Sequence, residues 1–106
     1  RAILCYLVEK YAKDDSLYPK DLKKRTVINH RLYFDIGTLY QSFLDYYCAV
    51  FETGKYGEPS KLEILKGSFK VLDNYLDGSA WASGNELSVA DYTIAATVAS
   101  CEVRCF

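Results

Sequence analysis

The stretch from Ser88 to Phe106 most constrains the fold, because it predicts a helix with a defined start and apolar residues on several sides. Ser88 and Asp91 stand in the S-x-x-D relation of a capping box, which marks a first helical turn. Three alanines keep the helix thin: Ala95, Ala96 and Ala99. Three larger residues put apolar surface on more than one side of it: Ile94, Val98 and Val103. A helix that is apolar nearly all round belongs in an interior. We therefore expect this helix at the centre of a bundle.

A second long stretch, Leu22 to Phe51, contains no proline and predicts a helix of about 30 residues, roughly 45 Å long at 1.5 Å per residue. Asp21 precedes it and is suited to cap its start. Two adjacent apolar stripes follow its length: Ile28, Leu32, Ile36, Leu39, Phe43 and Tyr46, and beside them Tyr33, Gly37, Tyr40, Leu44, Tyr47 and Phe51. Two stripes predict that two other elements pack against this helix, or that one element packs against it and the second stripe faces a cavity.

Two more helices are predicted from apolar spacing. The first runs from Arg1 to Tyr11 and has one apolar face. The second follows a possible capping box of Ser60 and Glu63, and Gly78 can end it.

The remaining segments predict loops. Residues 14–21 break the helical pattern, and Pro19 restricts the residue before it to extended geometry, so a linker between domains is expected there. Residues 52–59 form a loop by their glycines and proline. Everything after Pro19 is helical in type, which predicts an all-α helical bundle.

Length and charge limit the classes of protein that remain. The 106 residues amount to about one domain, and the net charge of −1 provides no electrostatic footprint for nucleic acid or an anionic membrane. No apolar run approaches the roughly 18 residues of a membrane span. The chain has no initiator Met and no helix-stop signal after Phe106, so we expect it to be part of a longer protein.

Four cysteines occur without a C-x-x-C pair or a disulfide-dense spacing: Cys5, Cys48, Cys101 and Cys105. We therefore expect reduced thiols and an intracellular chain. With His30, the pair Cys101 and Cys105 would give three metal ligands, fewer than the about four of a zinc site. Buried core cysteines are the simpler interpretation, and no metal is expected.

The aromatic residues of the long helix are the first candidates for a binding site. Aromatic rings offer large contact area and tyrosines add hydroxyls, so they could line a cleft for flat apolar ligands. The alternative, which spacing alone favours, is that they fill a bundle core. The residues concerned are Tyr33, Tyr40, Tyr47 and Phe51, with neighbouring Phe43 and Tyr46.

Several single residues have a structural and a functional interpretation. Asp35 could pair with Arg31 on the helix surface, which the spacing favours, or face a cationic part of a ligand or partner chain. Arg1 is expected to be a solvated cation and Trp81 a core residue. No histidine lies near Ser88, so its expected role is capping and not nucleophilic attack. The residues alone indicate no catalytic machinery.

Four ordered motifs together closely resemble cytosolic glutathione S-transferases of the insect delta/epsilon kind. They are Arg1-Ala2-Ile3 with Tyr6 to Tyr11, Asp15 to Pro19, Arg31 to Phe43, and Leu87 to Asp91. The resemblance covers essentially the whole chain.

This resemblance implies a domain arrangement. Residues 1–13 would be the last helix of a thioredoxin-like N-terminal domain, residues 14–21 the interdomain linker, and residues 22–106 most of a helical C-terminal domain. The serine that activates the glutathione thiol in this family would lie upstream of this chain. The chain alone is therefore expected to be inactive.

The resemblance also implies roles for individual residues. Arg1 and Asp35 would bind glutathione, and Tyr33 would interlock with its twin across a dimer. The pocket for the hydrophobic substrate would be lined by Tyr40, Phe43, Tyr47, Cys48 and Phe51. Where the family usually reads Tyr-Tyr-Tyr-Pro, this chain has Tyr46-Tyr47-Cys48-Ala49, which would change the pocket wall and straighten the helix.

The expected function is that of a part of a dimeric, cytoplasmic glutathione transferase that conjugates glutathione to hydrophobic electrophiles in detoxification. Glutathione would be the co-substrate, with no further cofactor, no nucleic acid and no membrane. The alternative is a non-catalytic, transferase-like helical domain for interaction or ligand binding.

Overall fold

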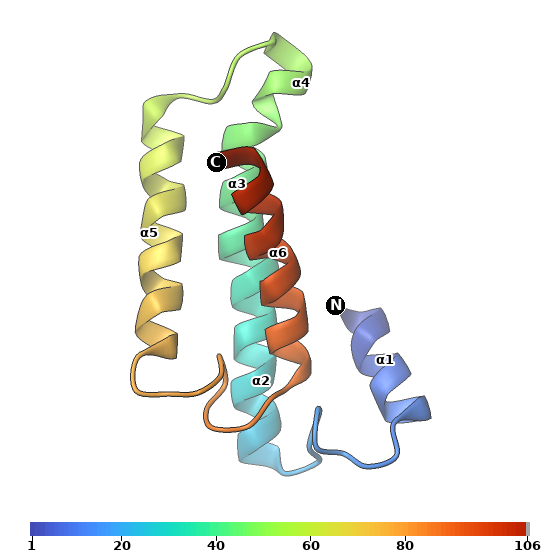
Figure 1. Cartoon of the computed structure of the whole chain (residues 1–106). Helices are drawn as coiled ribbons and strands as arrows, with labels where there is room; N and C mark the ends of the chain where they lie inside the picture. Colours follow the sequence, from blue (N-terminus) through green and yellow to red (C-terminus); the bar gives the residue numbers. More distant parts are fainter. Residues whose placement is uncertain (106) are drawn as a thin grey trace.

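The computed structural model describes residues 1–105, with side chains up to Glu102. Within this range every regular element is helical (Figure 1), so the all-α prediction is confirmed. The elements are α1 (Ala2–Tyr11), α2 (Leu22–Phe34), the π-helical segment η1 (Asp35–Leu39), α3 (Tyr40–Tyr47), α4 (Ala49–Thr53), α5 (Pro59–Leu76) and α6 (Val89–Cys105). Phe106 and the side chains of Val103 and Cys105 lie outside the described part.

The predicted long helix is a rod of four segments. Its start is as predicted, because the Asp21 carboxylate accepts a hydrogen bond from the Lys24 backbone N–H at 3.0 Å. In η1 the Tyr40 N–H donates to the Asp35 carbonyl, five residues earlier, which is the wider turn of a π-helix. At the other end Cys48 separates α3 from α4, so the straight helix expected there is interrupted.

The rod lies between α5 and α6, and α1 lies against its first half (Figure 1). Three clusters of buried residues form the core. One joins the middle of the rod to α5 and α6: Phe34, Leu39, Leu72, Ala82 and Ile94. A second lies under α1 and a third joins α3, α5 and α6: Ile28, Leu32, Val89 and Ala90, then Phe43, Tyr47, Leu65 and Cys101. The rod contributes to all three and is the central element.

Helix α6 begins where it was predicted to begin, but it is less buried than predicted. The Asp91 carboxylate accepts from the Ser88 backbone N–H at 2.9 Å, so the Asp91 half of the predicted capping box is formed. The Ser88 half is not, because the Asp91 N–H donates to the Ser88 backbone carbonyl and the Ser88 hydroxyl bonds to Ser83. One side of the helix is exposed, including Tyr92 at 51%; the exposed small residues are Ala95, Ala96, Ala99 and Ser100. The prediction of a helix buried all round is therefore wrong, because small alanines fit a surface as well as a core.

Two further expectations need correction. Helix α5 starts at Pro59, with Glu58 as N-cap and no side-chain capping bond, so the predicted Ser60–Glu63 box is not formed. Trp81 is 40% exposed and is not a core residue. It closes a tight loop with Gly84 through backbone hydrogen bonds of 2.8 and 3.2 Å, and the residue buried there is Ala82.

Candidate functional site

A buried polar cluster lies where α1, η1 and α6 meet. Asp35 is fully buried, and each of its carboxylate oxygens has a donor. Arg1 Nε donates to Oδ2 at 2.7 Å, and the Thr97 hydroxyl donates to Oδ1 at 2.6 Å. The Arg1 Nη2 atom also lies 3.5 Å from the Thr97 oxygen. A buried carboxylate is stable only with such partners, so the cluster fixes the Arg1 guanidinium.

This cluster replaces the surface pair that spacing favoured. Arg31 does not pair with Asp35: its Nε donates to the Ala82 carbonyl at 2.7 Å, and its guanidinium lies 3.8 Å from the centre of the Tyr75 ring. Arg1 is not the solvated cation that was expected, since its side chain is only 24% exposed. Both differences arise from contacts between residues far apart in the sequence, which local spacing does not report.

Arg1 also lines a groove of about 820 Å³ between α1 and the rod. The guanidinium carbon lies 5.1 Å from the centre of the Tyr40 ring, within the range of a cation–π contact. The structure thus places three predicted site residues, Arg1, Asp35 and Tyr40, in one group. A guanidinium of fixed orientation is suited to bind a carboxylate.

The predicted substrate-pocket residues lie in different environments. Phe43 and Tyr47 are at most 9% exposed and belong to the core. Tyr40 and Cys48 are half-buried, and the Tyr40 and Phe43 rings stack with centroids 6.0 Å apart. Phe51 is 76% exposed. The core interpretation therefore holds for two of these rings, and none of the five residues lines the groove beside Arg1.

The groove beside Arg1 has an exposed apolar border. Tyr33, which was predicted at a dimer interface, is 75% exposed there. Ile3, Tyr6 and Ile36 border the same groove and are 74%, 57% and 48% exposed. These four side chains form an exposed apolar patch beside the groove.

The thiol nearest to the groove is a poor nucleophile. Burial raises the pKa of the Cys5 thiol above its ordinary value, and burial also raises the pKa of the neighbouring Tyr18 phenol. The raised pKa keeps Cys5 largely in the thiol form at neutral pH. Because the thiolate is the nucleophilic form, Cys5 is unreactive there.

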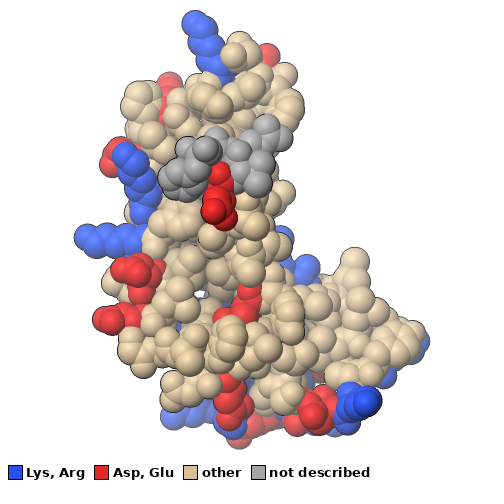
Figure 2. Space-filling model, in the orientation of Figure 1, with Lys and Arg blue, Asp and Glu red and all other residues tan. Residues whose placement is uncertain are grey.

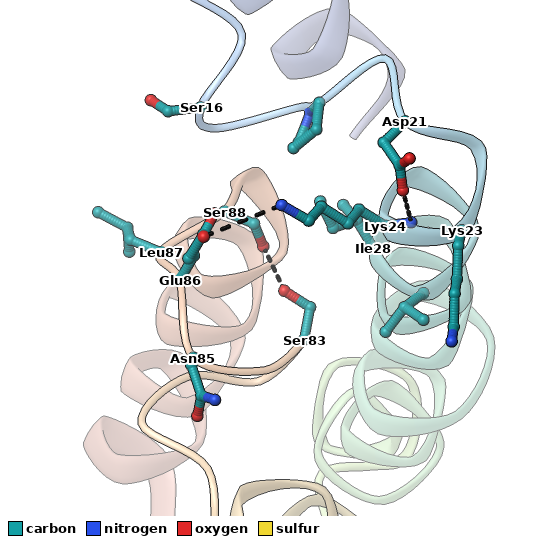
Figure 3. A pocket seen from close by; sticks show the side chains of 12 residues that line it. Ser16, Asp21, Lys23, Lys24, Ile28, Ser83, Asn85, Glu86, Leu87 and Ser88 are labelled. Atoms are coloured by element: carbon teal, nitrogen blue, oxygen red, sulfur yellow. Dashed lines mark hydrogen bonds and ion pairs between the residues drawn. The ribbon is translucent and has the colours of Figure 1, made fainter.

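A second hollow, of about 420 Å³, lies between the segment before α2 and the segment before α6 (Figure 3). Lys24 and Glu86 approach across it with 4.0 Å between Nζ and Oε1, and Asp21 caps α2 at its edge. The Ser88 and Ser83 hydroxyls share a hydrogen bond of 3.0 Å beside it. Charges of both signs line this hollow, so it favours no ligand charge.

The charges on the surface are mixed. Figure 2 shows basic and acidic side chains interspersed on the face in view, without a continuous basic patch. In the described part of the chain, no helix is both long enough and apolar enough to cross a membrane. Among the side chains described, no three His, Cys, Asp or Glu residues come together as metal ligands.

Sequence reasoning missed Thr97, which supplies the second hydrogen bond to Asp35. The available signal was a hydroxyl among small apolar neighbours, between Ala96 and Val98. Thr97 is only 3% exposed, and a buried hydroxyl needs a partner. The hydroxyl has a local acceptor, the Thr93 carbonyl at 3.2 Å, but Asp35 is 62 residues away and could not be identified from spacing.

Comparison with known proteins gives the family context. No protein-family model matches the chain. It is 53% identical over 103 residues to glutathione S-transferase D6 of Drosophila melanogaster, covering 97% of this chain and 48% of that relative. A solved delta-class glutathione transferase of Nilaparvata lugens matches with a TM-score of 0.95 and 45% identity, over 100% of this chain and 50% of that one.

An epsilon-class glutathione S-transferase of the housefly, Musca domestica, matches with a TM-score of 0.85 and 40% identity, over 93% of this chain and 46% of that one. The chain thus spans about half the length of the relatives that it matches. The resemblance noted in the sequence is confirmed: the homologues of this chain are insect delta- and epsilon-class glutathione S-transferases, and the chain has the all-helical fold of their C-terminal domain.

Proposed function

We propose that this chain is part of a glutathione transferase that conjugates glutathione to hydrophobic electrophiles. In this reaction the glutathione thiolate attacks the electrophilic atom, and a carbon–sulfur bond forms as the leaving group departs. A serine outside these residues would stabilise the thiolate by a hydrogen bond. The described residues would contribute the electrophile pocket, one side of the glutathione site and much of a dimer interface. Glutathione is the co-substrate, without a further cofactor, in the reduced cytoplasm.

The arrangement around Arg1 is the observation that carries this proposal. Its Nε is occupied by Asp35, and the terminal nitrogens have further N–H donors for a carboxylate at the glutamyl end of glutathione. Asp35 is fully buried, so its proposed role is to orient Arg1 and not to touch glutathione itself.

A conjugation assay with an activated aryl chloride tests the proposal in the full-length protein. We expect a glutathione-dependent rate above background, and no turnover by the 106-residue chain alone. A folded full-length protein without that rate would refute the enzymatic function. If such a protein still bound glutathione, the non-catalytic alternative would be supported.

Replacing Phe51 by alanine tests the electrophile pocket. Since Phe51 is 76% exposed, little burial is lost, and we expect thermal stability to stay nearly unchanged. We expect the KM for the electrophile to rise about five- to tenfold if the ring binds substrate, because partial burial of an aromatic ring contributes about 1 kcal/mol. The KM for glutathione should stay within twofold. Equal changes in both constants would show that Phe51 is not part of the pocket.

We also propose a homodimer, in which the exposed residues beside the groove contact a second copy of the chain. Tyr33 is the most exposed of them, so Tyr33→Glu should shift sedimentation of the full-length protein from dimer to monomer. The matched control is Tyr92→Glu, since Tyr92 is also exposed but lies on α6. A Tyr33→Glu variant that stays dimeric at micromolar concentration would place the interface elsewhere.

A further inference from the structure

Helix α1 contacts the rest of the molecule through few buried groups. All ten of its residues are described, and none is fully buried. Three half-buried side chains make its apolar contact with the bundle: Leu4, Cys5 and Val8. Two ion pairs complete the contact, Arg1 with Asp35 at the start of α1 and Glu9 with Arg25 towards its end. Eight residues separate the two pairs, about 12 Å along the helix.

Arg25 of α2 does more than pair with Glu9. Its Nη1 lies 2.8 Å from the Glu9 carboxylate. Its Nε donates to the Pro19 carbonyl at 2.7 Å, and its Nη2 donates to the Tyr18 carbonyl at 2.9 Å. The guanidinium carbon lies 3.9 Å from the centre of the Tyr18 ring. One side chain therefore connects α1, the segment before α2, and α2 itself.

The segment that Arg25 binds is held from other directions too. The Tyr18 hydroxyl donates to the Asn29 side chain at 2.8 Å, and the Leu17 carbonyl accepts from the Val89 N–H at 2.9 Å. This segment is thus fixed to both α2 and α6. Through its ion pair with Glu9, Arg25 also holds α1 against this fixed segment.

We propose that Arg25 is a positioning residue for the glutathione site, acting by holding α1 in the orientation that places the Arg1 guanidinium. The two ion pairs run in opposite senses, because α1 supplies the cation at its start and the anion towards its end. Together they oppose both rotation and sliding of α1. The Glu9–Arg25 pair is partly exposed, so it adds little to the global free energy of unfolding, and its effect is on the local attachment and orientation of α1. This inference rests on the proposed role of Arg1.

Kinetics of the full-length protein test the inference. We expect Arg25→Ala to raise the KM for glutathione about tenfold, because small displacements of a binding group weaken binding steeply. The KM for the electrophile should stay within twofold. Glu9→Gln leaves the Arg25 hydrogen bonds to the Pro19 and Tyr18 carbonyls in place and should give a smaller rise in this KM. Arg25→Lys should raise it less than Arg25→Ala does. Lys24→Ala, next to Arg25 on α2, is the matched control and should change neither constant. An unchanged KM for glutathione, or equal rises in both constants, would overturn the inference.

Hydrogen exchange of the α1 amides provides a test that does not depend on activity. We expect faster exchange in Arg25→Ala than in the parent protein, and no change in Lys24→Ala. Unchanged exchange in Arg25→Ala would overturn the positioning role whatever the kinetics show. If exchange rises in Arg25→Ala but calorimetry finds no glutathione binding to the parent protein, the proposed function itself is refuted. The role of Arg25 at a glutathione site is then refuted as well.

Discussion

Replacing Asp35 by alanine is expected to lower the free energy of unfolding of the intact protein by about 3 kcal/mol, the lower end of the range for breaking a buried ion pair. The lower end applies because Arg1 remains 24% exposed and stays partly hydrated. Thr97, which is buried, also loses the shorter of its two hydrogen bonds and keeps only the one to the Thr93 carbonyl at 3.2 Å. Urea unfolding followed by circular dichroism measures the change. The same variant should raise the KM for glutathione, since Arg1 loses its orienting partner.

Two further variants separate charge from shape in this cluster. Asp35→Asn keeps the size of the side chain and an acceptor for Thr97 but removes the charge opposite Arg1. It should therefore lower the free energy of unfolding less than Asp35→Ala does. Combining Asp35→Ala with Arg1→Ala should cost less than the sum of the single changes, because the pair is coupled. A loss below about 1 kcal/mol in Asp35→Ala would mean that the pair behaves like an exposed one.

Replacing Asp91 by alanine is expected to have a comparable effect, about 2 to 4 kcal/mol, because two buried N–H groups lose their acceptors. One carboxylate oxygen accepts from the Ser88 N–H at 2.9 Å and the other from the Ala82 N–H at 2.8 Å. Both donor residues are only 2% exposed, so water cannot easily replace the carboxylate. Thermal or urea unfolding of the intact protein measures the loss.

Ser88→Ala is the companion variant, and it should cost about 1 kcal/mol, because the hydroxyl loses its hydrogen bond to Ser83. The Ser88 hydroxyl bonds to Ser83 and lies 3.4 Å from the Asp91 carboxylate, while its backbone N–H keeps its acceptor. Asp91→Ala should therefore be the more destabilising of the two. If Ser88→Ala were equal or worse, the hydroxyl and not the carboxylate would be the main stabilising group at this helix start.

Helix starts could be predicted from the sequence where a side chain satisfies a backbone group nearby. Asp21 and the Ser88–Asp91 pair act within three residues, so their roles are visible in local spacing. The π-helical turn of η1 was not predictable in this way. Its apolar residues fit an α-helical stripe, and Ile36 was expected inside but is 48% exposed.

The candidate site was predictable only in part, for a related reason. The family motifs indicated Arg1 and Asp35 as site residues, but residue spacing favoured a local partner for Asp35. The partners observed, Arg1 and Thr97, are 34 and 62 residues away. Such pairs depend on how the helices pack, which no local pattern reports. The same holds for Arg25, whose contacts reach α1 as well as the adjoining segment.

The wide turn of η1 also constrains how chains of this kind can vary in length. Each residue of an α-helix advances the helix by about 100°. Losing one residue between Asp35 and Leu39 would therefore rotate α2 against α3 by about that angle, separating the two halves of the buried face. Chain-length differences between related proteins should for this reason fall at the loop positions directly after α4 and α5, where Gly54 and Gly78 are exposed and adopt positive φ.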